Sequence, residues 1–151
     1  MKKPLLLAAT AFLALSLGVS PKAAAQKTAP PRAMAVAGDT VWVVVNSIKP
    51  EKRAQFERFV NEVFWPIAAK MSPIDQRAFR QTRVLNAVKP EADGTYEYLF
   101  IMDPVQRGAS YDILTYLKKA YGNEKATEYY KLYTESLAGK GKVYSTVQTR
   151  Y

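Results

Sequence analysis

Hydrophobic and polar positions alternate with two different periods along residues 40–151, which predicts a mixture of strands and helices. Residues 41–48 (VWVVVNSI) are rich in β-branched side chains, and apolar residues at both parities predict a strand that is buried on both faces. After Pro50, which suits a first helical turn, apolar positions recur at steps of three and four and predict an amphipathic helix. We expect Pro66 to bend this helix and Ser72-Pro73 to end it.

The next segment, residues 78–88 (AFRQTRVLNAV), is compatible with two structures. Its Thr and Val residues favour a strand, whereas arginines at a spacing of three could share one side of a helix. Residues 89–94 (KPEADG) form a strong turn signal, and residues 95–102 (TYEYLFIM) are typical of a strand. A β-hairpin around this turn is therefore the better interpretation. The arginines in question are Arg77, Arg80 and Arg83.

The C-terminal part of the domain predicts a broken helix and a last strand. Ser110 or Asp112 can cap a first helix, Gly122-Asn123 interrupts it, and a second helix covers residues 124–138. Residues 142–151 (KVYSTVQTRY) alternate as a strand. The order β-α-β-β-α-β predicts an α+β fold of the ferredoxin-like type, a sandwich of a four-stranded antiparallel sheet and helices on one face.

Alternation along the predicted strands separates their side chains into two sets. We expect the more aromatic set on the face away from the helices: Trp42, Val44, Asn46, Tyr96, Tyr98, Phe100 and Tyr144. We expect the other set beneath the helices: Val43, Val45, Leu99 and Ile101. A sheet face with so many aromatic residues is expected to be covered by a partner rather than by water.

The N-terminus has the three parts of a secretory signal peptide. A basic start is followed by an apolar stretch over residues 5–19 and by small residues up to Ala25, where cleavage is expected. A retained membrane anchor is the alternative, but 15 residues are short for a span of about 20. We therefore expect residues 1–25 to be a signal peptide, residues 26–39 a flexible leader, and residues 40–151 the domain of an exported periplasmic or secreted protein without a stable membrane anchor.

Cleavage of the signal peptide would lower the net charge of the protein. The full chain has 22 basic and 13 acidic residues, a net charge of +9, and loss of three lysines with the signal peptide leaves 19 basic residues and +6. This moderate excess suits solubility, with attraction to anionic envelope surfaces as the alternative. The chain has no His and no Cys, which excludes disulfides, His or Cys zinc sites, Cys nucleophiles and imidazole-based triads. No metal and no cofactor are expected.

The segment of residues 41–60 (VWVVVNSIKPEKRAQFERFV), together with the later hairpin, helix and last strand, resembles the antibiotic biosynthesis monooxygenase (ABM) family of the dimeric α+β barrel superfamily. The resemblance implies a homodimer in which two sheets pack face to face, with a pocket in each protomer. Some members are cofactor-independent monooxygenases that act on aromatic polyketides or quinols. Others degrade haem with a His ligand, and the absence of His disfavours that branch.

Two main function hypotheses follow. In the first, the protein is an exported homodimer that binds a small aromatic or hydrophobic molecule and, in the sharper form, oxygenates it without a cofactor. That chemistry needs a pocket that deprotonates an electron-rich substrate and stabilises its anion. In the second, it is a non-catalytic envelope protein whose aromatic sheet face is only a dimer interface. An open pocket of several hundred cubic ångströms would favour the first hypothesis.

The candidate pocket residues carry aromatic, amide or guanidinium groups, and no catalytic role is assigned among them. They are Trp42, Asn46, Trp65, Arg83, Tyr96, Tyr98, Phe100 and Tyr144. Arg83 also has a plainer explanation, an ion pair with Glu97 across the hairpin. RNA binding is a third possibility for an aromatic ferredoxin-like sheet. The strand at 95–102 lacks the basic-Gly-aromatic start of that motif, so no nucleic-acid partner is expected.

Overall fold

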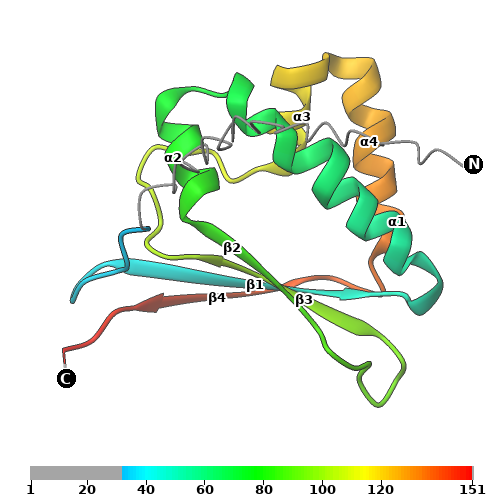
Figure 1. Cartoon of the computed structure of the whole chain (residues 1–151), viewed down its shortest axis with the longest axis horizontal. Helices are drawn as coiled ribbons and strands as arrows, with labels where there is room; N and C mark the ends of the chain where they lie inside the picture. Colours follow the sequence, from blue (N-terminus) through cyan, green and yellow to red (C-terminus); the bar gives the residue numbers. More distant parts are fainter. Residues whose placement is uncertain (1–31, 151) are drawn as a thin grey trace, which may run out of the picture. The chain divides into compact units, whose positions relative to one another are not determined.

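A four-stranded antiparallel sheet forms one layer of the protein, and the helices lie on one face of it (Figure 1). The computed structural model describes residues 32–150. The strands lie in the order β2-β3-β1-β4, with every neighbouring pair antiparallel, and this confirms the predicted ferredoxin-like α+β arrangement. Their bounds are β1 (Thr40–Ile48), β2 (Thr82–Asn86), β3 (Tyr96–Met102) and β4 (Lys142–Val147).

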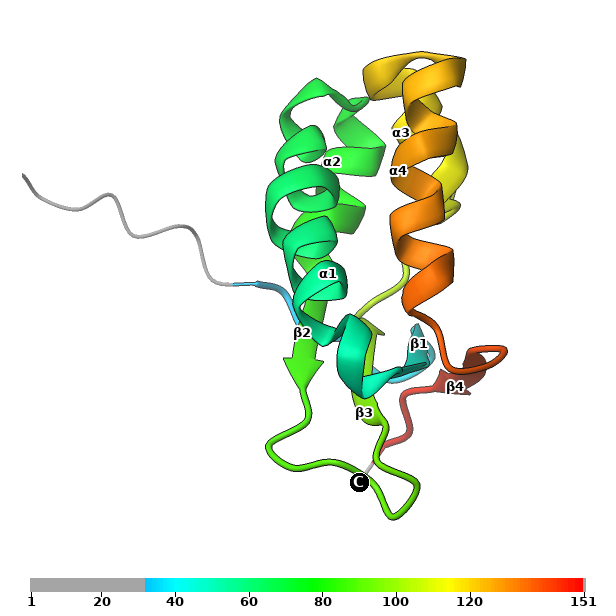
Figure 2. The same ribbon diagram turned by 90° about the vertical axis from the view of Figure 1, so that its right-hand side faces the viewer.

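The helices form two groups that stand side by side on the sheet (Figure 2). The first group is η1 (Pro50–Lys52), α1 (Arg53–Arg58), η2 (Phe59–Phe64), η3 (Trp65–Lys70) and α2 (Pro73–Gln81), and the second is α3 (Ile113–Tyr121) and α4 (Asn123–Ser136). The predicted amphipathic helix is confirmed, but its winding changes from α to π in η2 and to 3₁₀ in η3. Pro66 explains the change, because its ring would clash with the carbonyl four residues earlier in a regular α-helix.

The first run of helix ends at Lys70, just before Ser72-Pro73, as predicted, but Ser72-Pro73 also begins a further helix, α2, that was not predicted. The Ser72 hydroxyl accepts a hydrogen bond from the Asp75 backbone N–H at 3.3 Å, and Pro73 occupies the first helical position, where no N–H is needed. The hairpin of β2 and β3 is confirmed, but β2 starts only at Thr82. Of the three arginines with a spacing of three, Arg77 and Arg80 therefore lie in the helix α2, and Arg83 lies in the strand β2.

The split helix in the C-terminal half is confirmed. Asp112 caps α3, and its carboxylate accepts a hydrogen bond from the Thr115 N–H at 2.6 Å. Gly122 then separates α3 from α4 with a φ of 81°, in the region that favours glycine. The two helices pack against each other as a short antiparallel pair over the β1–β4 side of the sheet.

The predicted assignment of the two sheet faces is wrong. Asn46, Tyr98 and Phe100 are 3%, 1% and 7% exposed and lie beneath the helices, in the same core as Phe56. The side chains expected there lie on the face that no helix covers: Val43, Val45, Leu99 and Ile101. Alternation shows which side chains share a face but not which face is covered.

Tyr144 does not belong with the other aromatic residues of the sheet. The register pairs Trp42 with Ser145 and Val43 with Tyr144, so Tyr144 lies on the open face, where it is 52% exposed. The open face of the sheet carries seven apolar or aromatic side chains: Val41, Val43, Val45, Leu85, Leu99, Ile101 and Tyr144. The same register places five polar side chains on this face as well: Ser47, Arg83, Glu97, Lys142 and Thr146.

The predicted signal peptide over residues 1–25 and residues 26–31 of the leader lie outside the described residues. The described part of the leader contacts the domain, since the Ala35 N–H donates to Asp103 Oδ1 and the Gln81 side chain donates to the Ala33 carbonyl, both at 2.9 Å. Between residues 32 and 150, no helix combines the length and the apolar character that a membrane span requires.

Candidate functional site

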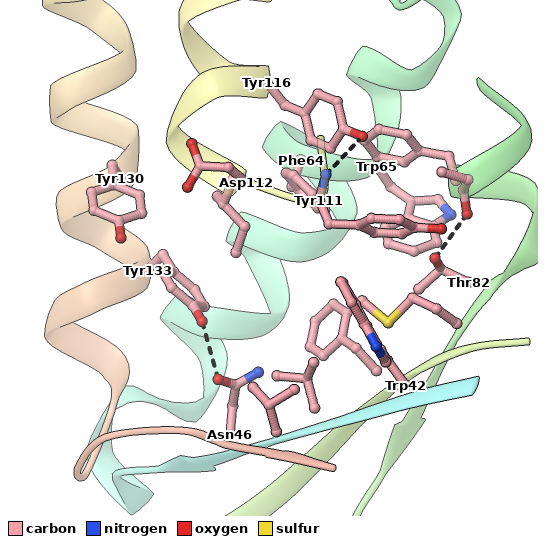
Figure 3. A pocket seen from close by; sticks show the side chains of 17 residues that line it. Trp42, Asn46, Phe64, Trp65, Thr82, Tyr111, Asp112, Tyr116, Tyr130 and Tyr133 are labelled. Atoms are coloured by element: carbon pink, nitrogen blue, oxygen red, sulfur yellow. Dashed lines mark hydrogen bonds between the residues drawn. The ribbon is translucent and has the colours of Figure 1, made fainter. Parts of the chain in front are cut away.

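A cavity of about 310 Å³ lies between the sheet and the helices (Figure 3). Its volume is at the lower end of the range typical of small-molecule sites, about 300–1,000 Å³. Nine of its 17 lining residues are aromatic: Trp42, Phe64, Trp65, Phe79, Phe100, Tyr111, Tyr116, Tyr130 and Tyr133. We call this space the aromatic cavity. Its chemistry suits a small, flat and largely apolar molecule.

Side chains from every layer of the fold meet around the aromatic cavity. Strands β1 and β3 supply Trp42, Asn46 and Phe100 from below. The change from π to 3₁₀ winding occurs where η2 meets η3, so the rings of Phe64 and Trp65 lie at the point where the helix is distorted. Distortions of this kind are frequent at functional sites.

Asn46 is the polar group at the base of the cavity. It is 3% exposed, and its Oδ1 accepts a hydrogen bond from the Tyr133 hydroxyl at 3.0 Å. In this orientation the amide oxygen faces Tyr133, and Figure 3 shows the amide nitrogen turned away from it. The nitrogen donates no hydrogen bond to any residue between 32 and 150. Asn46 therefore offers a fixed N–H donor to a ligand.

Gly141 allows this arrangement. A Cβ at this position would lie 3.0 Å from Asn46 Oδ1 and 3.2 Å from the Val45 carbonyl oxygen. The chain entering β4 can pass so close to β1 only because no side chain is present. Nothing in the sequence indicated this contact, because Gly141 lies in the short connection before β4.

The tyrosines of the cavity are hydrogen-bond donors rather than bases. Burial raises the pKa of both Tyr116 and Tyr133 to about 12, and it also raises the pKa of Tyr111. These hydroxyls therefore remain protonated at neutral pH. The lining residues include one carboxylate, Asp112, which is exposed and caps α3.

Tyr111 lies over Trp42 in a strained backbone conformation. Its φ is 55°, in the left-handed region that costs a non-glycine residue about 1 kcal/mol. The Tyr116 hydroxyl accepts a hydrogen bond from the Tyr111 N–H at 3.2 Å, and the Tyr111 hydroxyl accepts one from the Gln106 N–H at 2.7 Å. These bonds hold the Tyr111 ring 5.4 Å from the Trp42 ring.

Four of the eight predicted site residues line the aromatic cavity: Trp42, Asn46, Trp65 and Phe100. The other four do not. Arg83 and Tyr144 lie on the open side of the sheet, and the Arg83 guanidinium pairs with Asp103 at 3.2 Å rather than with Glu97.

Tyr96 and Tyr98 belong to a polar cluster with α1. The Tyr98 hydroxyl donates to Glu57 Oε1 at 2.5 Å, and Arg53 Nε donates to the Tyr98 oxygen at 3.0 Å. The hydrogen bond from Tyr98 is the main cause that lowers the pKa of Glu57, so Glu57 is ionised at neutral pH. The Arg53 guanidinium also lies 4.3 Å from the centre of the Tyr96 ring.

Sequence reasoning missed most of the helix-derived lining. Phe64 and Tyr133 carried a signal, since each belongs to an apolar helical stripe that must face the sheet. Tyr111 carried none, because it precedes α3 in an irregular loop. Among residues 32–150, no group of three or more acidic side chains is placed to hold a metal ion.

No family model matches the chain, and neither does any curated protein. Two solved structures are similar to it. One is a candidate antibiotic biosynthesis monooxygenase from Caulobacter crescentus, with 16% identity, a TM-score of 0.40 and coverage of 76% of this chain and 92% of its own. The other, a candidate monooxygenase of the same description from Bordetella bronchiseptica, has 19% identity, a TM-score of 0.37 and coverage of 75% and 99%. Both carry the family name suggested by residues 41–60.

Proposed function

We propose that the protein is exported and that it binds a small aromatic or hydrophobic molecule in the aromatic cavity. The observation that carries this proposal is an open space of about 310 Å³, lined by aromatic rings, with the free amide N–H of Asn46 at its base. A non-catalytic protein whose cavity was filled by its own side chains would lack that space. The export part of the proposal rests on the signal-peptide pattern of residues 1–25.

The cavity is best suited to a phenol or a quinol. The rings of Trp42 and Tyr111 offer stacking surfaces, and the ligand oxygen can accept the hydrogen bond that Asn46 leaves free. The phenolic proton leaves to solvent, because the neighbouring tyrosines stay protonated and the exposed Asp112 carboxylate is occupied by the Thr115 N–H. A phenolate held by Asn46 is electron-rich and can react with dioxygen: one oxygen atom enters the ring to give a quinone, the other leaves as water, and the substrate supplies all four electrons. Cofactor-independent oxygenation is therefore the activity that we propose for this site.

We also propose that the protein is a homodimer formed through the open face of the sheet. This face presents seven apolar or aromatic side chains across all four strands, with Leu85 46% and Tyr144 52% exposed. A second copy is the proposed occupant, because a face that carries apolar side chains and charges of both signs, here Arg83, Lys142 and Glu97, can be complementary to itself under a twofold axis. Burying it would remove an exposed patch of a kind that monomers rarely keep.

Titration of the mature protein, residues 26–151, with 2-naphthol tests the binding proposal. Fluorescence of Trp42 and Trp65, which line the cavity, reports occupancy. Asn46→Ala removes one hydrogen bond and should weaken binding about 5- to 10-fold. Asn86→Ala is the matched control: Asn86 lies two strands away in the same register row and does not line the aromatic cavity.

Absence of naphthol binding by the wild-type protein, or equal weakening by both variants, would contradict the binding proposal. Oxygen consumption in the presence of an electron-rich quinol, above the rate with heat-denatured protein, tests the catalytic part. We expect the uptake to fall in Asn46→Ala and to persist in Asn86→Ala. Binding without uptake would leave a ligand-binding protein and reject the oxygenase.

A further inference from the structure

A second cavity, of about 420 Å³, adjoins the aromatic cavity between the first helical group and the edge strand β2. We call it the outer cavity. Its lining is polar and apolar in similar measure, whereas the aromatic cavity is mainly apolar. The polar side includes the ionised carboxylate of Glu57 and the amides of Asn61 and Asn86, and it also includes the guanidinium groups of Arg32 and Arg83. The apolar side includes Phe56 and Val84.

Trp65 and Thr82 line both cavities and therefore form the partition between them. The Trp65 indole packs edge-on against the Phe79 ring, with 5.6 Å between ring centres and 70° between planes, and lies 6.0 Å from the Phe64 ring. Thr82 is 6% exposed, and its hydroxyl donates to the Ala78 carbonyl at 2.8 Å. The threonine is fixed by β2 and α2, so the indole is the larger and the replaceable part of the partition.

The position of Trp65 depends on the local winding of the helix. It is the first residue of η3, directly after the π-helical segment η2 and before Pro66. A wide turn followed by a tight turn rotates this side chain away from the direction that a continuous α-helix would give it. The distortion at Pro66 thus sets the direction of a tryptophan that lines both cavities.

We propose that Trp65 determines ligand size by closing the aromatic cavity off from the outer cavity. This inference rests on the proposed binding function and adds a specificity-determining residue to it. With the indole present, the site takes a small phenol. Without it, the joined space has more than twice the volume and accepts a polycyclic phenol, whose hydrocarbon end reaches the apolar side of the outer cavity at Phe56 and Val84.

Affinities for 2-naphthol, with two rings, and 1-hydroxypyrene, with four rings, test this inference by fluorescence titration of the mature protein. In Trp65→Ala we expect the affinity for 1-hydroxypyrene relative to 2-naphthol to rise at least tenfold over the wild-type ratio. Trp65→Phe keeps a ring in the partition and should stay within about threefold of that ratio. Trp42→Ala is the matched control, because it deletes the same side chain from a position that lines only the aromatic cavity.

The outcomes separate this inference from the proposed function. If the wild-type protein binds neither phenol, the binding function itself fails. If it binds 2-naphthol but Trp65→Ala leaves the ratio unchanged, or Trp42→Ala raises it equally, Trp65 is not the size-determining residue. Thermal melting of each variant verifies folding, and Trp65→Leu replaces Trp65→Ala in the same comparison if the alanine variant does not fold.

Discussion

Both faces of the sheet carry many apolar side chains, yet these differ in size, and the open face also carries Arg83, Glu97 and Lys142. The covered face carries large residues such as Tyr98 and Phe100, which are 1% and 7% exposed. The open face carries mainly Val, Leu and Ile, and its larger members Leu85 and Tyr144 are about half exposed. Neighbouring residues of one strand point to opposite faces, so the strand register decides which of the two environments each side chain enters.

This difference in size is connected with the presence of a cavity. Helices lie about 10 Å from a sheet, and long aromatic side chains are needed to bridge that depth. Rigid rings pack at angles, as Phe56 does against Phe100 at 89°, and such packing can leave space between them. Short aliphatic side chains produce a flatter surface, which is better suited to contact with another sheet. The same sheet therefore has one face for a ligand and one for a partner.

The largest effect that we expect comes from removing a ring on the covered side. Phe56 is fully buried and packs against Tyr98, Phe100 and Tyr133, so Phe56→Ala should lower the free energy of unfolding by about 3–5 kcal/mol. Leu85→Ala, on the open face, should cost less than about 1 kcal/mol at protein concentrations where the chain is monomeric. Urea unfolding measures both values. Equal losses of unfolding free energy in the two variants would contradict the expected difference between the two faces.

A charge on the open face should act on association rather than on folding. Val43 lies in the central strand β1, and Val43→Lys would place an ammonium group in the proposed dimer interface. We expect the dimer dissociation constant to rise at least about 100-fold, since an unpaired buried charge is costly. Val88→Lys is the control, because Val88 is fully exposed outside the strands.

Light scattering after size-exclusion chromatography measures this effect as a change of mass. The mature chain of 126 residues has a mass of about 14 kDa, at about 110 Da per residue, and the dimer twice that mass. A wild-type protein that elutes as a monomer at high concentration would disprove the dimer. A dimer that survives Val43→Lys would show that the open face is not the interface.

Sequence patterns predicted the elements of this fold better than their orientation. The order of strands and helices follows from periodicity and from turn residues such as Gly122, and it was predicted correctly. The orientation of the sheet was not, because β1 and β3 are apolar at both parities. The helix α2 was missed because Ser72-Pro73 serves equally well as the end of one helix and the cap of the next.

Half of the predicted site residues line the aromatic cavity, and strand alternation explains most of these successes. Trp42, Asn46 and Phe100 share a parity, so identifying one of them led to the others. Trp65 was selected for its residue type beside a proline. Tyr111 could not be predicted, because a loop residue with a positive φ follows no period. Arg83 was selected for its charge, but its parity is opposite to that of Val84, which lies on the covered face.

The smallest change in stability that we expect comes from Asp75, which connects two of the helices that cover the sheet. Its carboxylate, which is 3% exposed, accepts hydrogen bonds from the Ser72 hydroxyl at 2.7 Å and the Tyr116 hydroxyl at 3.0 Å, and so joins α2 to α3 above the aromatic cavity. Burial alone would raise the pKa of Asp75, but these bonds, the Ser110 N–H and the charge of Lys119 outweigh it and keep the pKa below its ordinary value.

The lowered pKa gives Asp75 a contribution to stability that depends on pH. A carboxylate with a depressed pKa stabilises the folded state fully above its unfolded pKa, about 3.9, and loses that contribution as the pH falls through the folded value. Asp75→Asn should therefore lower the free energy of unfolding by about 2 kcal/mol at pH 7, and the difference should shrink below about pH 4. Urea unfolding at pH 7 and at pH 3 measures it. A difference that does not vary with pH would mean that the ionised carboxylate does not join the two helices over the covered face.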